Sequence, residues 1–275
     1  MTDALLELDS VSKTFTRGGL FSRTQVEAVI DVSFRLETAK PEIFSIIGES
    51  GSGKSTLARI ILALQTPTRG TARFKGRDLA GLRNGADRHA FMASVQPVFQ
   101  NPFEAFNPLK RLDRYLYATC QRFAGAKDEA AMQAGADKAL RQVGLSLAEI
   151  KGRYPHELSG GQLQRVAIAR ALASGPSLLI ADEPVSMVDA SLRASIVNLF
   201  RKLRDELGLS IIYITHDLAT AYSISDRIII MQKGKVVESG DARTILADPQ
   251  HPYSKTLKES VLEPLAPGER PLFAR

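Results

Sequence analysis

The sequence predicts an α/β fold whose core is a mainly parallel sheet. Short apolar runs alternate along the chain with longer segments of helical periodicity, which is typical of parallel strands connected by helices. A glycine-rich loop, Gly48–Ser55, lies between one of these runs and a helical segment. The chain has 275 residues, of which 44% are hydrophobic and 24% charged, so it can bury a full core of this kind.

At the N-terminal end the pattern predicts two half-buried antiparallel strands. Apolar residues alternate with polar or acidic ones through Ala4–Val11 and again through Val26–Leu36. The segment Thr16–Gln25 contains glycine and arginine and is expected to form a turn or loop. We therefore expect an antiparallel β subdomain here.

The parallel sheet is predicted to begin with Glu42–Ile47, a short apolar run that leads into the glycine-rich loop. The elements expected next are a helix at Lys54–Leu64 and strands at Thr71–Phe74 and Met92–Phe99. Residues from about 101 to 160 contain helical patterns, such as Glu129–Leu140, and few β-branched residues. This change of character predicts an inserted α-helical subdomain.

Strands and helices alternate again in the last third of the chain. The expected elements are a buried strand at Leu178–Ala181, a helix at Ala190–Leu207, and strands at Ile211–Thr215, Arg227–Gln232 and Lys235–Glu238. Lys233 and Gly234 are expected to connect the last two strands. We assign residues 1–265 to one domain and 266–275 to a short C-terminal tail.

Composition limits the classes of protein that the chain can form. No apolar run approaches the roughly 20 residues that a membrane-spanning helix needs, so we expect a soluble chain that reaches a membrane only through partners. The single cysteine, Cys120, is expected to be a small core residue in a reducing compartment. The net charge is +6, but the basic residues are scattered, which favours solvated faces over nucleic-acid binding.

Gly48–Ser55 has the spacing of a phosphate-binding loop. Its glycines let the backbone wrap closely around a phosphate and direct successive N–H groups inward. The strand expected before the loop and the helix expected after it are the context that such a loop requires. Lys54 is then expected to reach the β- and γ-phosphates of a nucleotide, and the Ser55 hydroxyl to bind Mg²⁺.

A second helix N-terminus is marked by Leu158-Ser159-Gly160-Gly161-Gln162. Backbone N–H groups at a helix N-terminus bind phosphate. Since the loop at Gly48 already holds the nucleotide of this chain, we expect the donors around Ser159 to bind a nucleotide held by a second polypeptide.

Two carboxylates, Asp182 and Glu183, end the apolar run Leu178–Ala181. Asp182 is expected to hold Mg²⁺ through water, while Glu183 accepts a proton from the attacking water or orients it. Acidic residues at a strand end are common, so it is the position of this pair after the Leu158–Gln162 motif that gives it weight.

The order of these motifs resembles the ATP-binding cassette (ABC) family over nearly the whole chain. A phosphate loop alone is shared by kinases, GTPases and motors, but a P-loop kinase would leave Leu158–Gln162 and His216 without a role. The resemblance implies a P-loop NTPase cassette that hydrolyses ATP with Mg²⁺.

The resemblance also implies the roles of residues that are uninformative alone. Gln100 corresponds to the glutamine that senses Mg²⁺ and the attacking water, and His216 to the histidine that contacts the γ-phosphate. Asp189 matches the loop that crosses between two ATP sites, and Phe15 matches the aromatic that stacks on adenine, where tyrosine is commoner. The predicted catalytic residues are Glu183, His216, Gln100 and Lys54. The predicted ATP-binding residues are Phe15, Gly48, Ser50, Gly51, Gly53, Lys54, Ser55, Thr56, Gln100, Asp182, Ser159, Gly160, Gly161, Gln162 and Asp189. The predicted Mg²⁺ ligands are Ser55, Gln100 and Asp182.

Other segments resemble the ATPase subunits of oligopeptide, dipeptide and nickel importers. They are Tyr154–Glu157, Val98–Pro102 with Asn107–Pro108, and Asp248–Tyr253. A departure is Ala39–Glu42, where the family often has a glycine before the strand. Some members carry a cysteine cluster, and with Cys120 alone this chain cannot ligate an iron–sulfur cluster.

The resemblance implies partners and a location. The expected partners are a second ABC ATPase subunit, identical or homologous, two transmembrane permease subunits and, indirectly, an extracytoplasmic substrate-binding protein, without nucleic acid. The expected location is peripheral, at the cytoplasmic face of the inner (plasma) membrane, with peptides as the cargo. Phe103 and Phe106 are expected to be exposed and to border a groove for a permease helix. The alternative is a soluble ABC ATPase acting on nucleic acid or the ribosome, although such proteins generally carry two cassettes or a long coiled coil.

Overall fold

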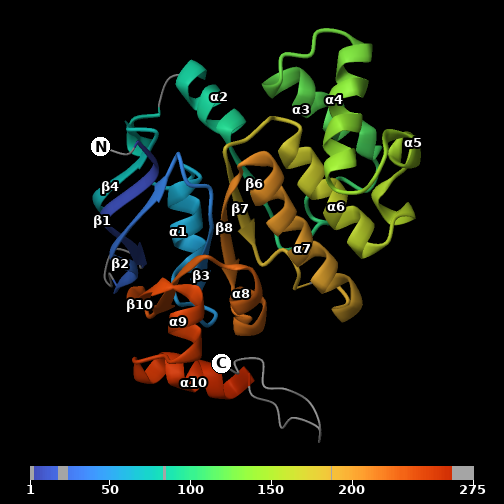
Figure 1. Ribbon diagram of the computed structural model, residues 1–275. Helices are drawn as coiled ribbons and strands as arrows, with labels where there is room; N and C mark the ends of the chain where they lie inside the picture. The colour runs from blue at the N-terminus through green and yellow to red at the C-terminus, as the bar shows by residue number, and fades with distance from the viewer. Residues whose placement is uncertain (1–2, 18–23, 83–84, 187, 262–275) are drawn as a thin grey trace, which may run out of the picture. The chain divides into compact units, whose positions relative to one another are not determined.

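The computed structural model describes residues 3–17, 24–82, 85–186 and 188–261. The chain divides into two compact units, which are described separately (Figure 1). The first unit comprises Met1–Leu82 and Ile212–Arg275, and the second comprises Arg83–Ile211. The predicted C-terminal tail, 266–275, lies outside the described residues.

The first unit contains the two ends of the sequence. Its strands are β1 (Ala4–Arg17), β2 (Thr24–Glu37), β3 (Ile43–Ile47), β4 (Arg69–Phe74), β5 (Arg77–Asp78), most of β8 (Ser210–Thr215), β9 (Arg227–Gln232) and β10 (Lys235–Asp241). Its helices are α1 (Lys54–Ile61), the short 3₁₀ helix η1 (Leu79–Gly81), α8 (Leu218–Ile224), α9 (Ala242–Ala247) and α10 (Pro252–Val261).

The predicted antiparallel pairing at the N-terminal end is confirmed. β1 pairs with both β2 and β4 in a four-stranded antiparallel sheet of order β2-β1-β4-β5. The loop predicted at Thr16–Gln25 is wrong at both ends, because β1 continues to Arg17 and β2 begins at Thr24. Threonines occupy this extension, and their β-branched side chains favour the strand although they interrupt the apolar alternation.

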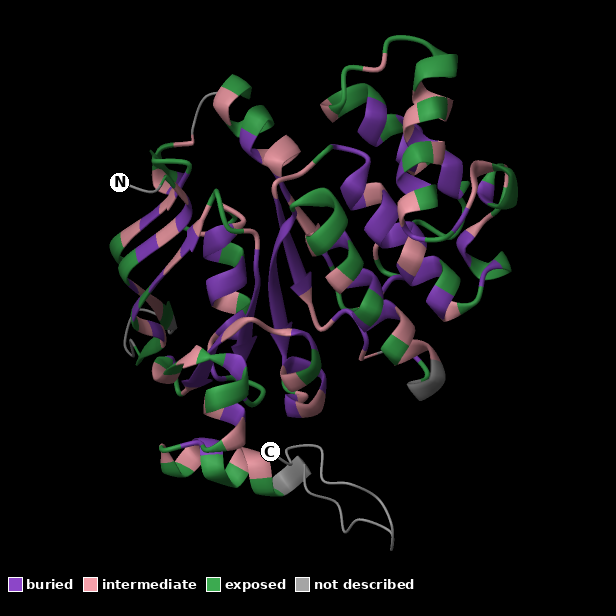
Figure 2. Cartoon of the chain, viewed as in Figure 1, coloured by how far each residue is buried: buried purple, intermediate pink, exposed green. Residues whose placement is uncertain are grey.

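The strand that leads into the glycine-rich loop lies inside a second sheet. Within the first unit this sheet has the order β10-β9-β3-β8. β3 is buried along its whole length and pairs in parallel with β9 (Figure 2). β10 pairs with β9 in antiparallel orientation through Lys233 and Gly234, which both have positive φ, as a two-residue type I′ hairpin requires. The predicted connection at Lys233-Gly234 is therefore confirmed.

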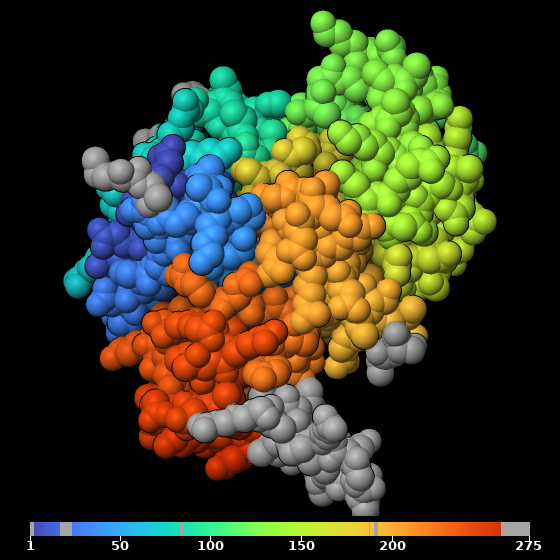
Figure 3. All heavy atoms as spheres, in the orientation of Figure 1, coloured from blue at the N-terminus to red at the C-terminus, as the bar shows by residue number. Residues whose placement is uncertain are grey.

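The C-terminal helices of the first unit pack beside the segment that carries the loop. A buried cluster joins β3, α8, β9 and α9, and α10 packs at its edge through Tyr253 and Leu257. In Figure 3 the orange and red surface of these C-terminal elements lies next to the blue surface of the N-terminal segment. No helix was predicted for α8, α9 or α10. α8 and α9 have only seven and six residues, so their apolar spacing does not stand out from the sequence.

The second unit is mainly helical. Its elements are α2 (Gly85–Ser94), β6 (Val95–Val98), α3 (Leu112–Phe123), α4 (Glu129–Gln142), α5 (Leu147–Ile150), the 3₁₀ helix η2 (Pro155–Glu157), α6 (Gly160–Leu172), β7 (Leu178–Asp182) and α7 (Ala190–Leu207). β6 and β7 pair in parallel. α7 has the predicted bounds.

The strand predicted at Met92–Phe99 is partly wrong. Residues 92–94 belong to α2, and the strand begins at Val95. The end of α2 is held by the turn before β7, since the Ser94 carbonyl accepts from the Ser177 N–H and the Ala93 carbonyl accepts from the Ser174 hydroxyl. These long-range hydrogen bonds are not visible in the local pattern.

The core position predicted for Cys120 is confirmed. Its side chain in α3 is 1% exposed, and burial raises the pKa of the thiol. No helix in the described part of the chain is long and apolar enough to cross a membrane.

Candidate active site

The loop between β3 and α1 depends on glycine at two close approaches. A Cβ at Gly48 would lie 2.3 Å from the Met231 carbonyl oxygen. A Cβ at Gly53, where φ is +106°, would lie 2.2 Å from the Ala28 carbonyl oxygen. Gly51 also has a positive φ, but the space around it is open. The loop is therefore pressed against β9 and β2 at its two ends and open in the middle.

Lys54 closes this loop from the inside. Its side chain is buried, and its ammonium donates to the Gly48 carbonyl at 2.7 Å and to the Glu49 carbonyl at 2.8 Å. The Ser52 N–H donates to the same Glu49 carbonyl at 3.2 Å. The predicted residues Gly48, Gly53 and Lys54 are thus brought together in one compact turn.

The residues of the loop fit a bound phosphate. α1 begins at Lys54, so the N–H groups of its first turn have no acceptor within the helix. The Ser52 hydroxyl is buried and has no hydrogen-bond partner among the described residues. Ser50 and Ser55 are exposed, and Thr56 follows in the same turn. Hydroxyl and carboxylate oxygens are ligands that Mg²⁺ prefers beside phosphate and water, so Ser55 also fits its predicted role.

One contact of the loop was not predicted. The Glu49 N–H donates to the hydroxyl of Tyr253, in α10, at 2.9 Å. Burial raises the pKa of this hydroxyl. The segment Asp248–Tyr253 is one of those that resemble importer ATPase subunits, but the sequence does not predict that it contacts the loop.

Two other predicted residues lie in the first unit. Phe15, in β1, is half-buried and pairs across the sheet with Val26, and the Lys13 ammonium lies 5.3 Å from the centre of its ring. Since Ala28 of the neighbouring strand touches Gly53, Phe15 is in the part of the sheet next to the loop. His216 directly follows β8 and is exposed.

In the second unit the structure brings Gln100 and Glu183 together. The Gln100 side-chain amide donates to the Glu183 carboxylate at 3.0 Å. Gln100 lies just beyond β6, and Glu183 follows Asp182 at the end of β7, so both are at the carboxyl ends of two paired parallel strands. Glu183 has a φ of +46°, which is unusual for a residue with a side chain and common at functional sites.

The Leu158–Gln162 motif forms the start of α6. Ser159 is the N-cap, and its hydroxyl accepts from the Gln162 N–H at 3.2 Å, while the Gln162 side chain accepts from the Ser159 N–H at 3.1 Å. This capping box fixes the first turn and leaves Ser159 exposed. A Cβ at Gly161 would lie 2.7 Å from the Leu192 side chain, so α6 and α7 touch here. Asp189 is exposed at the N-cap of α7.

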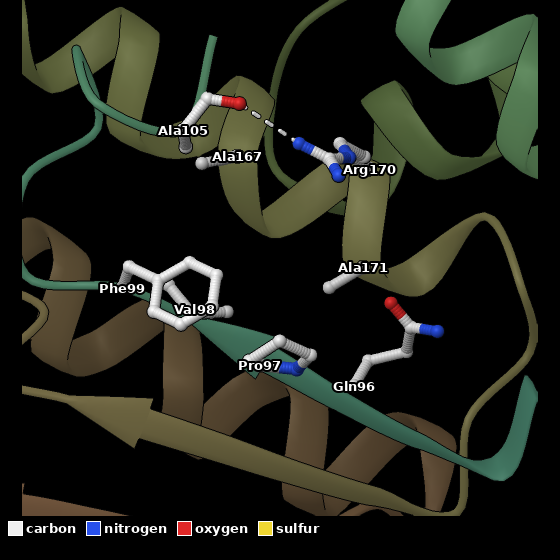
Figure 4. A pocket seen from close by; sticks show the side chains of 8 residues that line it. All are labelled: Gln96, Pro97, Val98, Phe99, Ala105, Ala167, Arg170 and Ala171. Carbon is white, nitrogen blue, oxygen red and sulfur yellow. Dashed lines mark hydrogen bonds between the residues drawn. The ribbon is translucent and has the colours of Figure 1, made fainter. Parts of the chain in front are cut away.

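Beside β6 the second unit has a small pocket that is partly open to solvent. Figure 4 shows Pro97 and Val98 on the strand, facing Arg170 and Ala171 of α6. The Arg170 guanidinium donates to the Ala105 carbonyl at 3.0 Å, and burial lowers the pKa of this group. Arg170 was not predicted, and no pattern distinguishes it from a surface arginine of a helix.

The expectation that Phe103 and Phe106 are both exposed is half wrong. Phe103 is 49% exposed, but Phe106 is 3% exposed. The Phe106 ring packs edge-on against Tyr115, and the Arg170 guanidinium lies 5.8 Å from its centre. A loop sequence bounded by prolines does not reveal which of its aromatics the neighbouring helices cover.

Most of the chain is similar to known proteins. Residues 30–186 match the protein family described as "ABC transporter". The chain is 41% identical to the oligopeptide transport ATP-binding protein AppF of Bacillus subtilis (strain 168), across 94% of this chain and 78% of that protein. It is 41% identical to the dipeptide transport ATP-binding protein DppF of Haemophilus influenzae, across 87% of this chain and 72% of that protein.

Solved structures are similar in both fold and sequence. A dimeric ATP-binding cassette in a post-hydrolysis state, bound to ADP and Pi, superposes with a TM-score of 0.74 at 30% identity, covering 86% of this chain and 98% of that one. A dimeric bacterial ABC transporter cassette superposes with a TM-score of 0.75 at 30% identity and the same coverage. The predicted fold and family are confirmed. The chain therefore belongs to the ABC transporter family, as an ATP-hydrolysing cassette.

Proposed function

We propose that this chain is the ATPase subunit of a membrane importer and that the cargo of the importer is peptides. The observation that carries the proposal is the phosphate loop closed around Lys54, in a chain whose relatives are named for oligopeptide and dipeptide transport. These names favour transport over the alternative of an ABC ATPase acting on nucleic acid or the ribosome.

In this proposal the first unit binds the phosphates of ATP. The N–H groups at the start of α1 and the Lys54 ammonium contact the β- and γ-phosphates, and Phe15 stacks on the adenine. Ser55, Asp182 and Gln100 are the residues that would hold Mg²⁺, which would neutralise charge on the phosphates. The Gly48 and Glu49 carbonyls already orient the Lys54 side chain, so this side chain needs little further ordering when the nucleotide binds.

Hydrolysis depends on the carboxylate of Glu183, which accepts a proton from the attacking water or orients it. Support comes from the Gln100 hydrogen bond, which holds one oxygen of that carboxylate, and from the unusual backbone conformation of Glu183. We assign to His216 the contact with the γ-phosphate. The reaction is phosphoryl transfer to water, in which the fixed charges of the site stabilise the transition state.

A second ABC ATPase subunit completes each ATP site. Gly160, Gly161 and Gln162 form the first turn of α6 after Ser159, and Ser159 is exposed. We propose that this turn binds the nucleotide on the partner's phosphate loop, with Asp189 in the segment between the two sites. The two solved cassettes described above are dimers, which supports this arrangement.

We propose that two permease subunits hold the chain at the cytoplasmic face of the membrane. Phe99, Phe103 and Leu109 are exposed apolar residues within a short segment of the second unit, at 50%, 49% and 86% exposure. This apolar segment surrounds the Gln100 position and suits a short permease helix, which docks through a few apolar anchors.

The test is purification of a tagged chain from membranes of its source, with identification of the chains that accompany it and measurement of ATP hydrolysis. We expect two permease chains to accompany the tagged chain. We also expect Mg²⁺-dependent ATP hydrolysis that a peptide-loaded binding protein stimulates. A Lys54→Ala variant should keep the same partners and lose hydrolysis. Recovery with ribosomes or nucleic acid instead of membrane subunits would contradict the proposal.

A further inference from the structure

We propose that Tyr253 is a positioning residue for the phosphate loop, and that α10 thereby belongs to the nucleotide-binding machinery. The inference rests on the proposed function, because it concerns the loop that we propose binds ATP. Its basis is the 2.9 Å hydrogen bond from the Glu49 N–H to the Tyr253 hydroxyl, between residues 204 positions apart in the chain.

This hydrogen bond acts on the peptide group that also holds Lys54. The Gly48 carbonyl and the Glu49 N–H belong to one planar trans peptide, so they point in opposite directions. The carbonyl accepts from the Lys54 ammonium at 2.7 Å, and the N–H donates to Tyr253. Rotation of this peptide would break both hydrogen bonds. Tyr253 therefore fixes the orientation of a carbonyl that orients the lysine.

The tyrosine ring is itself held in place. It packs against the buried cluster that includes Ile47, the residue directly before Gly48. The next residue of α10, Ser254, is 2% exposed, which places this side of the helix against the unit. Burial raises the pKa of the Tyr253 hydroxyl, whose oxygen accepts the Glu49 N–H.

The start of α10 is anchored by the residues just before the tyrosine. The Tyr253 N–H donates to Nδ1 of His251 at 3.2 Å, which caps the first turn. Pro252 occupies the first position of the helix, where proline is favoured. The Gln250 N–H donates to the Glu238 carboxylate of β10 at 2.6 Å. The run His251-Pro252-Tyr253 thus sets where the hydroxyl lies.

Loss of the hydroxyl alone tests this arrangement. In Tyr253→Phe the ring and its packing remain, but the Glu49 N–H loses its acceptor and the Gly48–Glu49 peptide can turn. We expect the Kd for ADP with Mg²⁺ to rise about 3- to 10-fold, the range that one hydrogen bond accounts for. KM for ATP should rise by a similar factor while kcat changes less, since Glu183 is not touched.

The matched control is Thr256→Val on the same helix. The Thr256 hydroxyl is exposed and donates to the Pro252 carbonyl within α10, so its loss removes a hydroxyl without reaching the loop. The measurements are isothermal titration of the full chain with ADP and Mg²⁺, and amide hydrogen exchange of the nucleotide-free chain over residues 48–54. Tyr253→Phe should bind more weakly and exchange faster in this segment, and Thr256→Val should match wild type in both.

Wild-type affinity and wild-type exchange in Tyr253→Phe would overturn the proposal. So would equal weakening in both variants, which would make α10 a merely structural support. Hydrogen exchange needs no nucleotide, so it separates this inference from the proposed function. If wild type and Lys54→Ala bind ADP alike, the proposed function fails, while faster exchange in Tyr253→Phe would still support the contact.

Discussion

At the residue scale, Glu183 combines a strained backbone with a restrained carboxylate. Its φ of +46° costs an ordinary residue roughly 1–2 kcal/mol, and its side chain accepts from Gln100 at 3.0 Å. We expect Glu183→Gln to keep this backbone and to bind ATP as wild type does. Turnover should fall about 10²-fold or more, because the amide cannot accept a proton from water. Single-turnover hydrolysis and filter binding of ATP check the two parts, and near-normal turnover would exclude Glu183 from the chemistry.

Phe103 and Phe106 are expected to differ in how much their substitution lowers the stability of the fold. Phe106 is buried against Tyr115, so Phe106→Ala is expected to lower the free energy of unfolding by about 3–5 kcal/mol. Phe103 is half exposed, so Phe103→Ala should cost less than about 1 kcal/mol. Urea unfolding followed by circular dichroism measures both. A large loss in Phe103→Ala would place that side chain in the core.

Phe103→Asp tests the docking surface separately from stability. It should uncouple transport from ATP hydrolysis in the reconstituted complex, because a charge weakens the contact with an apolar permease helix. Nucleotide affinity of the isolated chain should stay unchanged. Unchanged transport in this variant would place the docking surface elsewhere.

At the scale of elements, the phosphate loop depends on β2 as much as on its own sequence. Gly53→Ala would bring a Cβ within 2.2 Å of the Ala28 carbonyl, whereas Gly76, in the turn between β4 and β5, has a similar positive φ and open space. At both positions the left-handed backbone conformation destabilises alanine by roughly 1–2 kcal/mol. We expect Gly53→Ala to lower the free energy of unfolding by at least about 2 kcal/mol more than Gly76→Ala. Equal losses would show that β2 can move away from the loop.

The elements that could be predicted are those whose pattern is local. The β3 strand, the helix α7 and the turn at Lys233-Gly234 each follow from residues that are close in sequence. The end of α2 and the α10 contact with the loop could not be predicted, because hydrogen bonds to distant segments fix them. Gln100 and Glu183 are also distant in the sequence, so only the family resemblance suggests that they share a site. In the structure the pairing of β6 with β7 brings them into contact.

At the scale of the whole molecule, each ATP site is proposed to need two chains. Ser159→Arg would then block the site built on the partner's phosphate loop, while Lys54→Ala would disable the site on its own loop. In dimers with one altered subunit, photolabelling with an azido-ATP should show the loss on the unaltered chain for Ser159→Arg and on the altered chain for Lys54→Ala. Loss on the same chain from both changes would contradict the two-chain site.

ATP hydrolysis by this chain is proposed to drive peptide import. The most direct measurement uses the complex purified through a tag on this chain and reconstituted in vesicles with ATP on the side of the ATPase. Uptake of a labelled peptide and release of phosphate are followed together, for wild type and for Glu183→Gln. Both are expected to stop in the variant while the complex stays intact. Peptide uptake that continues at the wild-type rate in Glu183→Gln would contradict the coupling of import to hydrolysis.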